Sequence, residues 1–115
     1  MDYRDILRLL AIGDTSFLEE SLSEEGSGAG ALGLDQKVVA FARLAASVAI
    51  ATSPSGYQGH VDAALAAGAS MDEIVGVLIA VAPTVGWARS VLAAPPLGLA
   101  LGYDTDAALE RLDSD

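Results

Sequence analysis

The chain of 115 residues contains a single histidine, His60, which is its best candidate for moving a proton near neutral pH. Unperturbed histidine has a pKa of about 6.5, so a small change of environment lets it act as acid or base. Tyr57 lies one helical turn earlier, and Ser53 comes shortly before it. Trp87 and Arg89 stand together in the segment GWAR. An arginine can hold a carboxylate bidentately, and a hydroxyl can donate to a carbonyl or enolate oxygen. The candidate catalytic residue is therefore His60, and the candidate substrate contacts are Ser53, Tyr57, Trp87 and Arg89.

Each of these residues also has an ordinary structural role open to it. A lone histidine near the start of an alanine-rich helix is often only a hydrogen-bonded surface or interface residue. Tyr57 and Trp87 could be packing anchors with one satisfied polar atom. Arg89 could pair with an acid across a subunit boundary. Sequence patterns leave both interpretations open.

The candidate residues lie around two helices with clear start and stop signals. Ser53 is a typical N-cap, followed by Pro54 at the first helical position, where the missing N–H is not needed. Gly68 has the place of a residue that ends a helix in the left-handed conformation. Ser70 and Glu73 have the spacing of a capping box for the next helix. The pattern predicts a sharp helix–corner–helix.

The rest of the chain also shows helical periodicity, and no segment alternates like a strand. We expect helices over 2–12, 16–24 and 35–51, a glycine-rich loop over 24–33, and a last short helix capped by Asp104 or Thr105. Pro83 with Gly86 should kink or end one helix, and Pro95 with Pro96 should break the next. The expected fold is all-α, a compact bundle of about six to seven helices. Residues 1–33 are expected to form short helices and a linker, and 34–115 the helical domain.

The order of these features resembles the carboxymuconolactone decarboxylase family, which includes the alkylhydroperoxidase D-like proteins. The resemblance begins with LDQKVVAFARLAASVAIA and continues through the histidine, the AG corner, DEI and GWAR, so that it covers roughly Leu34 to Leu101. It implies the helical fold of that family and oligomers, trimers or hexamers, of helical subunits.

The peroxidase branch of that family carries a Cys-x-x-Cys pair shortly before the histidine and a glutamate on the preceding helix. Counting back from His60 puts Gly56 and Ser53 at the cysteine positions and Phe41 at the glutamate position. The chain has no cysteine, so it has no thiolate nucleophile and no disulfide relay. Cysteine-dependent peroxidase activity is therefore not expected.

Composition limits the partners. A formal charge of −10 with six lysine and arginine residues argues against nucleic acid binding. The apolar runs are shorter than the roughly 20 residues that cross a bilayer, so no membrane span is expected. No targeting segment is evident, which favours a cytoplasmic protein. One histidine without cysteine predicts no metal site, and no cofactor motif is present. Since much of the apolar half is alanine, the core of one subunit should be thin, and we expect a homo-oligomer.

Three hypotheses for function stay open. The first is a cofactor-free acid/base lyase or isomerase, of the decarboxylase or lactone-isomerase kind, acting on a small carboxylated or lactone substrate with His60 as acid or base. The second is a catalytically silent family member that serves as an oligomeric small-ligand-binding or scaffold protein. The third is a subunit that acts only with a catalytically complete partner.

Overall fold

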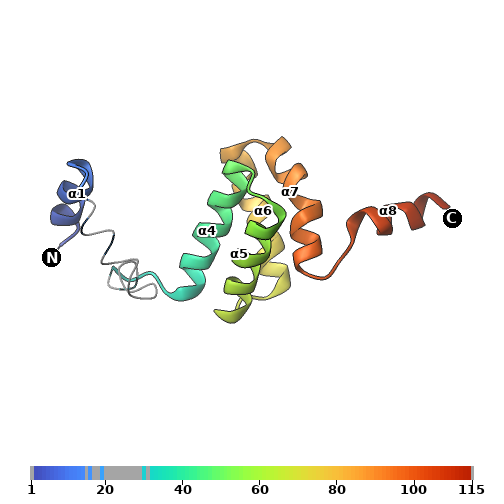
Figure 1. Cartoon of the computed structure of the whole chain (residues 1–115), viewed down its shortest axis with the longest axis horizontal. Helices are drawn as coiled ribbons and strands as arrows, with labels where there is room; N and C mark the ends of the chain where they lie inside the picture. Colours follow the sequence, from blue (N-terminus) through green and yellow to red (C-terminus); the bar gives the residue numbers. More distant parts are fainter. Residues whose placement is uncertain (1, 15, 17–18, 20–29, 31, 115) are drawn as a thin grey trace. The chain divides into compact units, whose positions relative to one another are not determined.

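The computed structural model describes residues 2–14, 16, 19, 30 and 32–114. Within these residues every regular element is an α-helix and no strand occurs (Figure 1). The six helices are α1 (Tyr3–Ala11), α4 (Gln36–Ile50), α5 (Pro54–Ala66), α6 (Met71–Val85), α7 (Trp87–Ala100) and α8 (Thr105–Ser114). The all-helical prediction is confirmed for this part of the chain. The predicted helix 16–24 and most of the glycine-rich loop lie outside the described residues.

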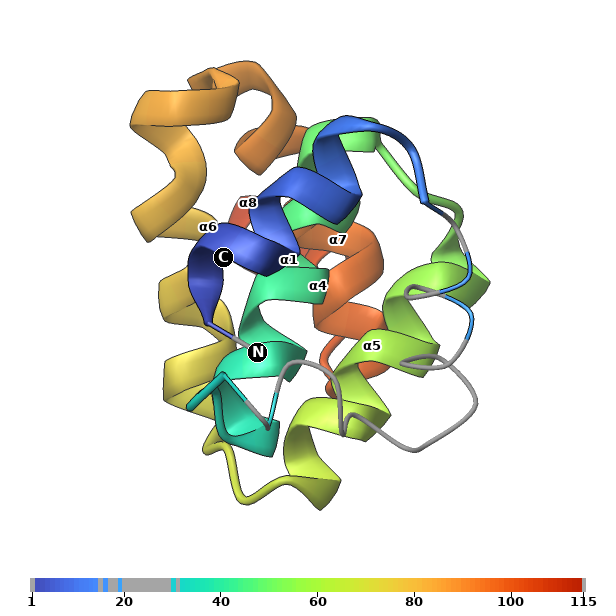
Figure 2. The same cartoon turned by 90° about the vertical axis from the view of Figure 1, so that its left-hand side faces the viewer.

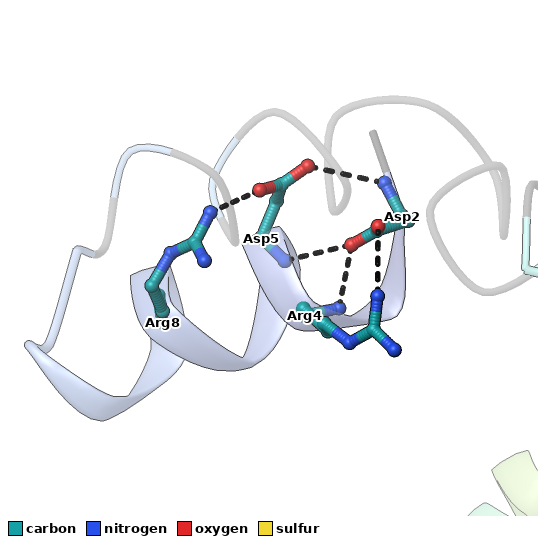
Figure 3. Close-up of polar contacts among 4 residues, drawn as sticks. All are labelled: Asp2, Arg4, Asp5 and Arg8. Carbon is teal, nitrogen blue, oxygen red and sulfur yellow. Dashed lines mark hydrogen bonds and ion pairs between the residues drawn. The ribbon is translucent and has the colours of Figure 1, made fainter.

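The chain forms two compact units, Met1–Val39 and Ala40–Asp115, so that the division falls within α4. The sequence-based boundary between residues 33 and 34 stays a prediction. The first unit contains α1, whose N-terminus is held by a capping box (Figure 3). The Asp2 carboxylate accepts from the Arg4 and Asp5 N–H groups at 2.8 and 3.2 Å, and the Asp5 carboxylate accepts from the Asp2 N–H at 3.2 Å. Asp5 also pairs with Arg8.

The second unit has a core of small side chains. Helix α7 packs on α5, α6 and α8, and Figure 2 shows the bundle from a second side. The largest fully buried side chains are all aliphatic: Leu44, Val48, Val61, Ile74 and Leu97. The buried Ser90 hydroxyl donates to the Leu78 carbonyl oxygen at 2.8 Å, which ties α7 to α6. Alanines such as Ala40, Ala64 and Ala93 fill the core between these larger side chains.

The corner between α5 and α6 matches its prediction. Gly68 has a φ of 94°, and its N–H donates to the Leu65 carbonyl while the Ala69 N–H donates to the Ala64 carbonyl. These two bonds form a Schellman motif, the common glycine-dependent helix end. Ser70 and Glu73 then form the complete capping box that starts α6.

The prolines of α6 and α7 all lie inside their helices. Helix α6 ends at Val85, before Gly86 with its φ of 98°, as predicted. The predicted break at Pro95 and Pro96 is wrong, because α7 runs through both prolines to Ala100. A proline inside a helix deprives the carbonyl four residues earlier of its donor and crowds it with the ring, a local cost that packing can offset. The buried face of α7 packs against the bundle on both sides of this point and holds the helix together; it comprises Ser90, Ala93, Leu97 and Gly98.

Candidate functional site

A pocket of about 400 Å³ lies in the second unit, between the start of α5 and the part of α7 from Ala88 to Pro96. Three segments form it: the corner between α4 and α5, the first turn of α5, and one face of α7. The lining residues are Ala51, Thr52, Tyr57, Ala88, Arg89, Leu92, Ala93 and Pro96. On α7 they recur at the spacing of one helix face, because residues three and four apart are neighbours on a helix. Most of the wall is apolar, with three polar side chains: Thr52, Tyr57 and Arg89.

Tyr57 forms the buried floor of this pocket. Its side chain is only 2% exposed, yet its hydroxyl makes no hydrogen bond with any described residue. Among the described residues that are not exposed, no fully buried side-chain oxygen or nitrogen lacks a partner, so the hydroxyl oxygen keeps access to solvent. Tyr57 is one of the residues that line the pocket. Burial raises the pKa of the phenol above its ordinary value of 10.0. Tyr57 is therefore a protonated hydrogen-bond donor at neutral pH.

Arg89 supplies positive charge at the edge of the same pocket. Its side chain is exposed, and no carboxylate of the described chain pairs with it. It lies in the first turn of α7, which begins after Gly86 without a side-chain cap in the described structure. The N-terminal end of a helix carries a partial positive charge and N–H groups without helical acceptors. The guanidinium and the helix end together make this rim of the pocket favourable for an anion.

The other predicted site residues lie elsewhere. Ser53, Trp87 and His60 are not among the described residues that line the pocket. The Ser53 hydroxyl accepts from the Gly56 N–H at 3.3 Å as the N-cap of α5, which confirms its predicted capping role. Trp87 is 64% exposed at the start of α7. His60 is half-buried on α5, one turn after Tyr57.

The family's second cysteine position, Gly56, is packed by a neighbour. A Cβ atom built on Gly56 would lie 2.3 Å from Thr52 Oγ1 and 3.1 Å from Thr52 Cγ2. Real Cβ atoms do not approach another side-chain atom this closely, so the Thr52 side chain takes up the space that any side chain at position 56 would need. Sequence reasoning missed Thr52. The sequence did carry a signal for it. Thr52 is a hydroxyl residue directly before the Ser53 cap, and it lies four residues before Gly56, a glycine within the predicted helix.

A larger hollow of about 660 Å³ lies in the first unit along α1, lined by Asp5, Arg8, Leu9, Ala11 and Ile12. Its two charged groups pair with each other, so they do not present a free charge to a ligand. Across the described parts of the chain, no group of three or more histidine, aspartate or glutamate residues is placed to hold a metal ion. None of the described helices is long and apolar enough to cross a membrane.

The described residues form an all-helical fold in which a mostly apolar pocket with polar side chains lies between α5 and α7. Residues 21–97, more than half of the chain, match the model of the carboxymuconolactone decarboxylase family. The chain therefore belongs to this family, as its motif order predicted. Neither the comparison with curated proteins nor the comparison with solved structures gave a match.

Proposed function

We propose that this member of the carboxymuconolactone decarboxylase family binds a small carboxylated molecule in the pocket between α5 and α7. One observation carries the proposal: Arg89 and the unpartnered hydroxyl of Tyr57 come from different helices and line the same mostly apolar hollow. Arg89 would hold the carboxylate, helped by the N-terminal end of α7. Tyr57 would donate a further hydrogen bond to the bound carboxylate, because its phenol is protonated at neutral pH.

Binding of simple carboxylates tests this proposal directly. Titration calorimetry with pentanoate should show saturable binding, and Arg89→Met should weaken it by about 10-fold to 100-fold, the usual worth of a charge-assisted hydrogen bond. Arg43→Met is the matched control, since Arg43 is also exposed and does not line the pocket. Equal weakening by the two substitutions would contradict a specific site at Arg89.

For the reaction we propose cofactor-free acid/base chemistry of the lyase or isomerase kind, with His60 as acid or base. Family membership supports this chemistry, and His60 follows the pocket residue Tyr57 by one turn of α5. The test substrate is the one in the family's name, a lactone that carries a carboxyl group. Release of carbon dioxide should fall by roughly 10²-fold to 10⁴-fold in His60→Gln, while pentanoate binding stays within about twofold. Full activity of His60→Gln would remove His60 from catalysis.

A second candidate function is ligand binding without catalysis. It is favoured by Phe41 and Gly56 at the family's reactive positions and by the place of His60 outside the pocket lining. The two functions are separated by one experiment. If the carboxylated lactone binds with an affinity that depends on Arg89 but is recovered unchanged after prolonged incubation, the binding function stands and the lyase function falls.

We also propose that the protein works as a cytoplasmic homo-oligomer, a trimer or hexamer. Large apolar side chains on α6 and α7 are exposed in the single chain; they include Val75, Ile79, Trp87, Val91 and Leu92. Many exposed large apolar side chains on two packed helices favour an interface between subunits. Sedimentation should show an assembly at micromolar concentration, and a stable folded monomer would contradict the proposal.

A further inference from the structure

The corner between α4 and α5 is built differently from the other helix ends of the chain. Helices α1, α5 and α7 each end at a glycine with positive φ: Gly13, Gly68 and Gly102. At the end of α4 the same Schellman pattern occurs at Ala51, with a φ of 54°. The Ala51 N–H donates to the Val48 carbonyl at 3.2 Å, and the Thr52 N–H to the Ser47 carbonyl at 3.1 Å. Ala51 is the one non-glycine residue with positive φ among those described.

This strained corner fixes Thr52. The bond from its N–H to Ser47 holds its backbone, and its side chain packs over Gly56 of α5. The hydroxyl lies close to Gly56, because a Cβ built on that glycine would be only 2.3 Å from Oγ1. The Thr52 hydroxyl has no hydrogen-bond partner among the described residues, and Thr52 lines the pocket beside Tyr57. Ser53, not Thr52, caps α5, so capping does not explain this hydroxyl.

We propose that Thr52 is a specificity-determining residue of the pocket, whose hydroxyl donates to a second oxygen acceptor of a ligand whose carboxylate is held by Arg89. The pocket would then favour carboxylates that carry a carbonyl oxygen over equally long carboxylates that lack one. This inference rests on the proposed carboxylate-binding function and adds a second ligand group, a carbonyl oxygen, to the carboxylate. Strain at Ala51 is consistent with it, because strained backbone persists where the surrounding structure over-determines it and is concentrated at functional sites.

The test compares pentanoate with 2-oxopentanoate and 4-oxopentanoate, which have the same chain length and differ in a keto oxygen at two distances from the carboxylate. Calorimetry on the wild-type protein should show that at least one oxo acid binds about 3-fold to 10-fold more tightly than pentanoate, the worth of one neutral hydrogen bond. Thr52→Val keeps the shape of the side chain and removes the hydroxyl. In this variant the preference for the oxo acid over pentanoate should disappear.

Thr52→Ser is the matched control, because it keeps the hydroxyl and loses only the methyl group, and it should keep the preference. An oxo-acid preference that survives in Thr52→Val, or is absent from the wild type, would overturn the inference. Pentanoate binding that depends on Arg89 would in that case still support the proposed function. If none of the three acids binds, both proposals fail.

Discussion

Two corners of the second unit share one design and differ in detail. Each ends a helix with a Schellman motif and starts the next helix with a serine N-cap, Ser53 at one corner and Ser70 at the other. At the α5–α6 corner the left-handed position is Gly68, and Ser70 is part of a complete capping box. At the α4–α5 corner the left-handed position is Ala51, and the Ser53 hydroxyl accepts from the Gly56 N–H at 3.3 Å and bonds the Ser55 hydroxyl at 3.0 Å, with no capping box.

The α5–α6 corner, with glycine at its left-handed position, contributes no residue to the pocket. The α4–α5 corner, with alanine at that position, contributes Ala51 and Thr52. An L-residue in the left-handed region costs about 1 kcal/mol or more, and an incomplete cap gives up a few tenths more. The chain therefore departs from the most stable choice of residues where its pocket is built. The comparison suggests that stability at this corner is limited by the shape that the pocket needs.

The largest effect is expected from filling the space under Thr52. Gly56→Ala places a Cβ where Thr52 Oγ1 lies, whereas a Cβ at Gly59, one turn along α5, meets nothing within 4 Å. Overpacking of this kind costs about 1 to 3 kcal/mol, so the free energy of unfolding of Gly56→Ala should lie below that of Gly59→Ala by about this amount. Urea denaturation measures the difference.

A double substitution shows whether Thr52 is the cause. Gly56→Ala combined with Thr52→Ala removes the hydroxyl that the new Cβ would meet, and it should recover much of the lost stability. If the two substitutions are simply additive, the close approach of Thr52 does not control position 56.

The next effect comes from exchanging the residue types of the two corners. Gly68→Ala forces an L-residue to a φ of 94° and should lower the free energy of unfolding by about 1 kcal/mol. Ala51→Gly relieves the same kind of strain and should raise it by about 0.5 to 1 kcal/mol. Chemical denaturation of both variants gives the signs, and a loss of stability in Ala51→Gly would show that position 51 is not strained.

A smaller difference is expected from the two caps. Ser70→Ala removes the acceptor of the Glu73 N–H at 3.0 Å and breaks the capping box, so it should cost about 1 kcal/mol. Ser53→Ala removes a longer bond from a helix whose first turn is already set by Pro54, and it should cost about 0.5 kcal/mol. Equal losses in thermal or urea unfolding would show that both caps are equally strong.

Local rules of helix capping were enough to predict much of the fold. Ser53, Ser70 with Glu73, and Gly68 signal their roles through nearby residues, so the helix–corner–helix was predicted from sequence. The continuation of α7 through Pro95 and Pro96 was not predicted, because it depends on packing against α5 and α6 rather than on local preference.

The site could be predicted only in part for the same reason. Tyr57 and Arg89 were chosen for their chemistry, and the structure brings both to one pocket. Thr52 was missed, because its importance comes from a left-handed alanine before it and from the close approach to α5. The left-handed alanine has no signature in the order of residues, since alanine rarely takes that conformation.

Ionisation of the Tyr57 phenol should have the smallest effect on stability at neutral pH. Its effect on the free energy of unfolding should appear only at alkaline pH. Because burial raises the pKa of Tyr57 above 10.0, the folded chain keeps a proton that the unfolded chain has already lost at high pH. Unfolding then releases a proton, so the free energy of unfolding should fall as the pH rises above about 10. Tyr57→Phe has no phenol to ionise, and its free energy of unfolding should fall less steeply above that pH.

Urea denaturation of the wild type and Tyr57→Phe checks this prediction. The difference in their free energies of unfolding should be constant from about pH 6 to 9 and should shrink or reverse above about pH 10. Parallel curves over the whole range would show that Tyr57 ionises as freely in the folded chain as in the unfolded one, and the description of its hydroxyl as a buried donor in the pocket would be wrong.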